Sequence, residues 1–335
     1  MNILKKTTGV SILMMMLCFA YTQAKVLQIN ISQDSATKYE EGKSYNFKVS
    51  SKNGEHALAI EYIAGDKKSK LILTAPHGGD LKPEFMHTRT KDFVVTTNDN
   101  EVGDTESFSG ISDSKTLELT KELANEIKRT TGLRPHIILN HLHRSKLDAN
   151  RARSLAAQND ENAENAWDVF HKYIEDAKSQ VKKNGDGLLL DIHGNAHRPQ
   201  RTEIGLLLKG KDFIAEDLEK FADKSSVKAL VRPGKATLTE LIKGKYALGS
   251  LLNNNGIVAT PSQLMPDPID ARLFPDGRYF NGGYNTARHG SRFSGNISAI
   301  QLEFNGDVRM EDKKRTEAVK SISKSITQFM IKYFN

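Results

Sequence analysis

Short apolar runs alternate with amphipathic segments along most of this chain. Four runs rich in Leu, Ile and Ala are typical of buried strands: 71–75, 136–140, 188–195 and 298–304. Three segments carry apolar residues at helical spacing: 114–130, 167–181 and 319–329. The order strand, helix, strand, helix, strand is the signature of a parallel sheet with right-handed crossovers. We therefore predict an α/β fold, a mostly parallel (mixed) sheet with helices on both faces.

The helix expected at 114–130 has clear end signals. Asp113 or Ser114 is the expected N-cap, Gly132 the expected C-cap, and Pro135 prevents continuation. An acidic group at this helix start would be held in a fixed place near the edge of the sheet.

The remaining segments predict a short leader, a β-rich extension and one large domain. Residues 25–66 alternate apolar and polar positions between turn signals, which predicts an N-terminal β-rich extension. The catalytic domain would span 67–335. Within it we expect a further strand at 205–208 and a long Gly- and Pro-rich loop at 261–295.

The first 24 residues have the pattern of a secretory signal peptide. Lys5 and Lys6 give the positive start, an apolar stretch follows, and Ala24 ends a small-residue cleavage site. We expect cleavage after Ala24, a secreted or periplasmic protein, and no stable membrane insertion afterwards. An uncleaved anchor is the alternative. Cys18, the only cysteine, lies in this segment, so the mature chain would have no disulfides and no cysteine metal ligands.

Composition narrows the class of protein but not its activity. With 38% hydrophobic residues, the chain can build an ordinary core. The formal net charge of +7 falls to +5 without Lys5 and Lys6 and is spread along the chain, which suits a small anionic substrate. Nucleic acid is not an expected partner, because few basic residues cluster and no aromatic residues are interleaved with them.

Two predicted strands deliver a histidine into a glycine turn, and these histidines are candidate metal ligands. His77 follows the run at 71–75, and His193 ends the run that begins at Leu188. Reactive groups collect where parallel strands end, so the two imidazoles are expected to converge on one ion. Asp191 lies on the same side of its strand as His193 and would hold the ring nitrogen that faces away from the metal.

Catalytic zinc sites typically use three protein ligands from histidine and carboxylate, and we expect a carboxylate as the third ligand here. Asp80 lies three residues after His77, Asp113 precedes the first helix, and Glu84 is a distant third candidate. The residues alone leave this choice open.

Hydrolysis also needs a base, and Glu303, on an otherwise apolar strand, is the best candidate. It shares its face with Gln301, and the alternative is that this face is solvated.

Several other polar residues are candidates for supporting roles. The basic cluster of Arg144, Arg151 and Arg153 suits capture of a carboxylate, or forms a solvated surface. Three further histidines are expected to support the site or lie at the surface: His141, His143 and His289.

Five segments in order resemble the N-formylglutamate amidohydrolase family over about residues 70 to 310. They are 75–79, 144–151, 190–194, 282–290 and 300–303. That family looks related to the zinc carboxypeptidases and the N-acetylmuramoyl-alanine amidases. The resemblance therefore implies a zinc-exopeptidase/phosphorylase-hydrolase-like sheet.

The resemblance also implies roles for individual residues. One zinc ion would be held by His77, Asp113 and His193, with Asp80 fitting the carboxypeptidase spacing instead. Glu303 would be the general base that activates a zinc-bound water. Arg144 or Arg288 would stabilise the oxyanion, and the substrate carboxylate would be held by a neighbouring pair, Asn150 and Arg151.

The implied activity is zinc-dependent cleavage of the amide bond in an N-acyl (formyl-like) amino acid or a related small carboxylate-bearing substrate. Formylglutamate arises inside cells, whereas this chain carries an export signal, so the chemistry can carry over while the substrate does not. The alternatives are a secreted zinc peptidase or cell-wall amidase acting on a larger substrate, and an inactive secreted binding protein of the same fold.

Overall fold

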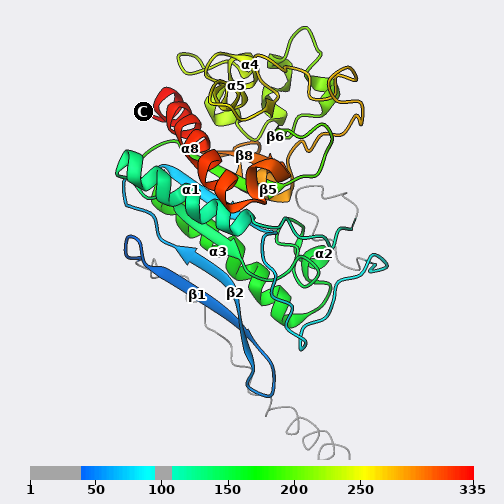
Figure 1. Cartoon of the computed structure of the whole chain (residues 1–335). Coiled ribbons are helices and arrows are strands. Elements are labelled where there is room, and N and C mark those ends of the chain that lie inside the picture. Colours follow the sequence, from blue (N-terminus) through cyan, green and yellow to red (C-terminus); the bar gives the residue numbers. More distant parts are fainter. Residues whose placement is uncertain (1–38, 95–107) are drawn as a thin grey trace, which may run out of the picture. The chain divides into compact units, whose positions relative to one another are not determined.

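The computed structural model describes residues 39–94 and 108–335 (Figure 1). The predicted signal peptide at 1–24, with Cys18, lies outside the described residues, as does the beginning of the expected β-rich extension. No helix within the described ranges is long and apolar enough to cross a membrane.

The described strands form one eight-stranded sheet in the order β1-β2-β4-β3-β5-β8-β6-β7. The four strands expected from the apolar runs, β3, β4, β5 and β8, lie side by side and run parallel. The hairpin β1–β2 pairs antiparallel with β4, and β6 pairs antiparallel with β8. The predicted α/β class with a mixed, mostly parallel sheet is therefore confirmed. The strands are β1 Ser44–Ser50, β2 His56–Ile63, β3 Leu71–Ala75, β4 His136–Asn140, β5 Gly187–Gly194, β6 Thr202–Gly205, β7 Ala259–Thr260 and β8 Ile297–Phe304.

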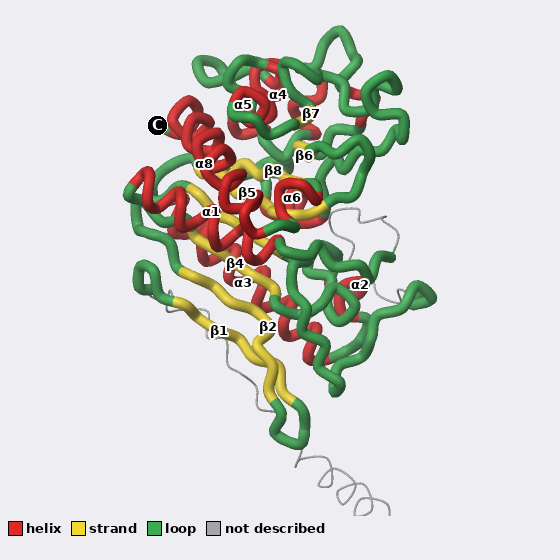
Figure 2. Tube along the Cα trace, in the orientation of Figure 1, coloured by secondary structure: helices red, strands yellow, loops and turns green. Residues whose placement is uncertain are grey.

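Helices cover both faces of the sheet (Figure 2). The long helices α1 and α8 pack together on one face, where α4 and α5 extend the same apolar cluster. The helix α3 covers the other face, together with α2 and α6. The helices are α1 Thr116–Thr131, α2 Arg153–Ala157, α3 Glu161–Lys182, α4 Leu238–Lys243, α5 Leu248–Asn254, α6 Tyr284–His289, α7 Gly306–Arg309 and α8 Asp312–Phe334.

Alternate residues of the central strands enter different cores. On β5, Leu188 and Leu190 pack with α1 and α8, whereas Leu189 packs with α3. Burial on both faces explains why these strands read as nearly continuous apolar runs. Towards the end of β5 the α3 side changes from Leu189 to Asp191 and His193, so the polar cluster extends directly from the core.

Three predictions about the elements were wrong. Helix α1 begins at Thr116 with Lys115 as its N-cap, so neither Asp113 nor Ser114 caps it. The strand expected at 205–208 ends at Gly205 as β6, because the chain leaves the sheet there. The expected loop at 261–295 contains the short helix α6.

Candidate metal centre

His77, Asp113 and His193 lie together where β3 and β5 end, and all three are buried. Their candidate ligand atoms lie within 4.8 Å of one another. Asp113 Oδ2 is 3.1 Å from His193 Nδ1 and 3.5 Å from His77 Nδ1. Ligand atoms on a tetrahedral zinc ion, with bonds of about 2.0–2.1 Å, lie about 3.3 Å apart. The spacing therefore suits a single metal ion.

Backbone contacts bring the three ligands together. The backbone N–H of Asp113 donates to the carbonyl oxygen of His77 over 2.9 Å. The Asp113 carboxylate also accepts from the N–H of Gly194 over 3.1 Å. Gly78 allows the turn after β3 to reach the start of α1, since a Cβ at Gly78 would lie 2.4 Å from Thr116 Oγ1. Asp113 is thus fixed by the turn beside it rather than by capping the helix.

Each histidine ring is held by a second carboxylate at Nε2. His77 Nε2 lies 2.6 Å from Asp148 Oδ1, and His193 Nε2 lies 2.8 Å from Asp191 Oδ2. A carboxylate at one ring nitrogen fixes the tautomer and leaves the other nitrogen for a metal. Nδ1 of His77 is buried and has no hydrogen-bond partner within the described part of the chain. The donor set and this unpaired nitrogen both fit a bound metal ion.

The buried charges of the cluster also favour a bound metal ion. Asp113, Asp148 and Asp191 are all buried, and buried carboxylates need nearby positive charge. Burial alone raises the pKa of Asp113, but the neighbouring His193 and His77 hold that pKa below its usual range. A divalent cation would supply further compensating charge.

Glu303 lies beside His193, its partner in the parallel pairing of β5 with β8. Glu303 is 5% exposed, and its carboxylate accepts a hydrogen bond from Gln301 Nε2 over 2.8 Å. Burial raises the pKa of Glu303 to about 8, an effect that Asp113 and Glu203 reinforce and His193 opposes. The face that carries Gln301 and Glu303 is therefore buried, which rules out the solvated alternative.

The structure separates the two arginines considered for the oxyanion. Arg144 Nε donates to Asp148 Oδ2 over 2.9 Å. Burial alone lowers the pKa of Arg144, but Asp148, Asp113 and Glu303 raise it. Arg288 instead has its guanidinium 5.2 Å from the Trp167 ring centre. These contacts place Arg144 at the cluster.

Asn150 lies beside His193, and both Asn150 and Arg151 are buried. Asn150 Nδ2 lies 3.5 Å from His193 Nε2, and its Oδ1 accepts from the N–H of Asn285. Arg151 Nη1 donates to the carbonyl oxygen of Asn150 over 2.9 Å. Arg153 pairs with Asp168 on the surface of α3.

The other carboxylates and histidines considered from the sequence lie elsewhere. Asp80 and Glu84 are exposed, and neither belongs to the metal-binding group found among the described residues. The extra histidines have other partners: His141 pairs with Glu61, His143 with Ser145, and His289 with His171 and Glu175.

Sequence reasoning missed two residues that organise the site. Asp148 holds both His77 and Arg144; its position four residues after Arg144 was the available signal. Arg309, in α7, donates to the backbone carbonyl oxygens of Ser114, Asn195 and Phe304. These three residues come just after Asp113, His193 and Glu303, so Arg309 joins the three segments that carry the site. No pattern in the sequence connects Arg309 with them.

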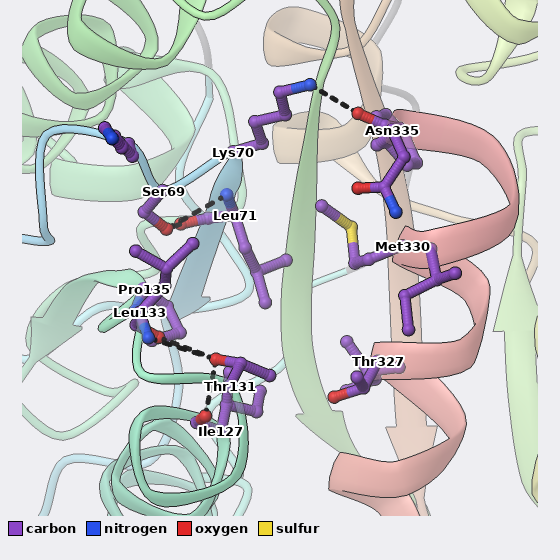
Figure 3. Close-up of a pocket in the computed structure, with 14 residues that line it drawn as sticks. Ser69, Lys70, Leu71, Ile127, Thr131, Leu133, Pro135, Thr327, Met330 and Asn335 are labelled. Carbon is purple, nitrogen blue, oxygen red and sulfur yellow. Dashed lines mark hydrogen bonds between the residues drawn. The ribbon is translucent and has the colours of Figure 1, made fainter.

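An apolar cavity of about 210 Å³ lies at the opposite ends of the strands (Figure 3). Leu71 at the start of β3, Ile127 of α1 and Met330 of α8 line it, with Lys70 at one side. Its lining contains no histidine or carboxylate side chain, so it offers no hydrolytic chemistry.

The chain was compared with known proteins. No family model matches it, and no curated protein does. Among solved structures it is similar to N-formylglutamate amidohydrolase from Ralstonia eutropha, with 13% identity, 78% of this chain and 92% of that chain covered, and a TM-score of 0.43. It is also similar to an N-acetylmuramoyl-L-alanine amidase of Nostoc punctiforme, with 11% identity, 79% of this chain and 98% of that chain covered, and a TM-score of 0.34. A similar amidase from Mycobacterium abscessus has 11% identity, with 78% of this chain and 98% of that chain covered, and a TM-score of 0.33. At these values the likeness concerns architecture alone, and the function rests on the residues of the site.

Proposed function

We propose that this chain is a zinc-dependent amidohydrolase that cleaves the amide bond of an N-acyl amino acid or a related carboxylate-bearing substrate. The observation that carries the proposal is the buried group of His77, Asp113 and His193 with Glu303 beside it. Two imidazoles and one carboxylate leave a fourth zinc position for water or substrate, as in catalytic zinc sites.

The proposed roles follow from where each side chain lies. A zinc ion held by His77, Asp113 and His193 would act as a Lewis acid, polarising the scissile carbonyl and lowering the pKa of bound water. Glu303 takes the proton of the attacking water and passes it to the leaving nitrogen. Gln301 orients the Glu303 carboxylate through its hydrogen bond. Arg144, held by Asp148, stabilises the negative charge on the carbonyl oxygen.

The substrate carboxylate is assigned to Arg151 together with Asn150. The contact of Asn150 with His193, and that of the Arg151 guanidinium with the Asn150 carbonyl oxygen, support this role. A planar guanidinium binds a carboxylate through two parallel hydrogen bonds. Truncating Arg151 is expected to raise KM more than it lowers kcat.

Metal analysis is the first test of the proposal. Elemental mass spectrometry of the purified protein should give about one zinc per chain, and His193→Ala should lose it. A wild-type protein that holds no metal after reconstitution with zinc would overturn the proposal and leave the binding-protein interpretation.

Glu303→Gln separates catalysis from metal binding. Glutamine keeps the size of the side chain but cannot take a proton, so turnover should fall by roughly 10²–10⁴-fold. Zinc content and the unfolding midpoint should stay as in the wild type. Unchanged turnover in this variant would remove Glu303 from the mechanism.

A substrate panel distinguishes the proposal from its alternatives. Small N-acyl amino acids are expected to be hydrolysed faster than peptides or muropeptides. The reverse preference would favour a peptidase or cell-wall amidase. A zinc-loaded protein that turns over none of these would favour the inactive binding protein.

A further inference from the structure

A second histidine–carboxylate pair lies on the side of Glu303 away from the metal ligands. In the antiparallel pairing of β6 with β8, Glu203 is the direct partner of Glu303. Such partners point to the same face, with Cβ atoms about 4.5–5.5 Å apart. His193, Glu303 and Glu203 therefore form one row across three neighbouring strands. The function proposed above uses only the first two.

Several contacts hold His197 beside this row of residues. Its Nδ1 lies 2.8 Å from Glu203 Oε1, and its ring stacks on Phe280 with centres 4.5 Å apart and planes 10° apart. Its backbone N–H donates to Asn195 Oδ1 over 3.1 Å. Asn195 Nδ2 in turn donates to the carbonyl oxygen of Glu303 over 2.6 Å. The imidazole is therefore fixed relative to the candidate base by both its ring and its backbone.

The surroundings of Glu203 define which nitrogen of His197 remains for a ligand. Glu203 is fully buried; its carboxylate also forms an ion pair with Arg201 Nη2 over 3.0 Å and accepts a hydrogen bond from the N–H of Phe280 over 2.7 Å. A carboxylate paired with an arginine accepts hydrogen bonds only, so Nδ1 of His197 carries the proton. Nε2 of His197 makes no hydrogen bond to the described residues. It is not one of their fully buried unpaired atoms, so it keeps some exposure to solvent.

Resting on the proposed amidohydrolase function, we propose that His197 Nε2 accepts a hydrogen bond from the N–H of the scissile amide. In the tautomer that carries its proton on Nδ1, the ring offers a lone pair at Nε2. The nearby carboxylates of Glu203 and Glu303 favour an N–H group, and the amine that forms from it, over a second carboxylate.

This contact has a defined place in the reaction. The water oxygen bonds to the acyl carbon as the bond from that carbon to nitrogen breaks, and the water proton passes through Glu303 to the nitrogen. Because His197 holds the N–H on the side of the nitrogen opposite Glu303, the nitrogen lone pair turns towards Glu303. His197 would thus select amides whose leaving nitrogen carries a hydrogen.

Two substitutions form a matched pair for the test. His197→Asn keeps a polar group near the Nδ1 position, which can still contact Glu203, but has none at Nε2. His197→Gln places an amide oxygen near the Nε2 position, where it can accept the same hydrogen bond. On an N-acyl amino acid, His197→Asn should lower kcat roughly tenfold or more, the equivalent of one hydrogen bond. His197→Gln should recover part of that loss.

The ester analogue of the same substrate distinguishes a direct contact from a structural role. An ester has no hydrogen on its leaving oxygen, so the loss caused by His197→Asn should be several-fold smaller on the ester than on the amide. Zinc content and the unfolding midpoint of both variants should match the wild type. An equal loss on both substrates, or wild-type kinetics on the amide, would overturn the inference.

Binding tests the inference independently of turnover. Calorimetry would compare an N-acyl amino acid with its N-methyl counterpart on zinc-loaded protein. The wild type should prefer the compound with the N–H, and His197→Asn should lose that preference. A preference unchanged by the substitution, or binding of neither compound, overturns the inference. A zinc-loaded wild type that binds with this preference but does not hydrolyse overturns the proposed function instead.

Discussion

Asp148 accepts hydrogen bonds from His77 through one oxygen and from Arg144 through the other. One buried carboxylate therefore orients both a candidate metal ligand and the arginine assigned to the oxyanion. Its own pKa is held well below the usual range, because the positive charge of Arg144 and the contact with His77 outweigh the effect of burial. Such outer carboxylates determine how firmly a histidine holds its metal.

Asp148→Asn is expected to weaken zinc binding by about 10–100-fold, because an amide orients the His77 ring less firmly than a carboxylate does. Competition with a chelator of known affinity measures the change. Asp168→Asn is the matched control, since Asp168 pairs with Arg153 at the surface, and it should bind zinc as the wild type does. Equal zinc affinity in the two variants would contradict this role for Asp148.

At the scale of the elements, Gly78 is a point where the turn after β3 and the start of α1 come too close for any side chain. A Cβ there would lie 2.4 Å from Thr116 Oγ1 and 2.7 Å from the backbone nitrogen of Leu117. Since the second atom is backbone, only a shift of α1 or of the turn can relieve the contact. That shift would separate His77 from Asp113.

Gly78→Ala is therefore expected to lower the free energy of unfolding by about 1–3 kcal/mol and to reduce zinc content. Urea unfolding and elemental analysis measure the two effects. Gly306→Ala is the control, because its nearest neighbour would be Gln200 Oε1 at 3.5 Å, an ordinary contact. Normal zinc content in Gly78→Ala would show that the turn can adjust without moving the ligands.

The elements predicted correctly are those whose pattern is set by burial. Strands β3, β4, β5 and β8 and helices α1, α3 and α8 all carry long or unbroken apolar patterns, because each packs against a core. The missed helices, α2, α4, α5, α6 and α7, have seven residues or fewer and show no full helical repeat. Their ends depend on tertiary contacts, as in β6, which stops at Gly205 because the backbone at Asn281 and Gly282 packs there.

The same distinction applies to the site. His77, His193 and Glu303 were recognisable because each interrupts or ends an apolar strand. Asp113 was placed near the start of α1, but its contact with His193 depends on the turn through Gly78 and could not be read from spacing. Asp148 pairs with His77, which lies 71 residues before it, and one sequence carries no signal for such a long-range pair.

At the scale of the whole molecule, buried neutral histidines link stability to pH. His136, at the start of β4, accepts at Nδ1 from the N–H of Gly65 and lies 2.8 Å from the Tyr62 hydroxyl. Burial lowers the pKa of His136 to about 4. Burial likewise lowers the pKa of His289 to about 4, although Glu175 opposes it. Both are therefore neutral in the folded protein at pH values where the unfolded chain takes up a proton.

Stability is expected to fall as the pH drops from about 6.5 towards 4, because only the unfolded chain gains the proton in this range. A shift of this size at His136 corresponds to about 3 kcal/mol once the pH is below both pKa values. His136→Asn keeps an acceptor for Gly65 without a titrating group, so its stability should depend less on pH over the same range. Urea unfolding at several pH values tests this, and parallel curves for the two proteins would contradict it.

The strand order also has a consequence for how the chain matures. Strand β8 lies between β5 and β6, yet it follows both in the sequence. A ribosome therefore releases His77, Asp113 and His193 well before Glu303, and β5 and β6 have no strand between them until β8 arrives. Metal capture can thus precede catalytic competence during synthesis, and the open strand edges are most exposed to aggregation in that interval.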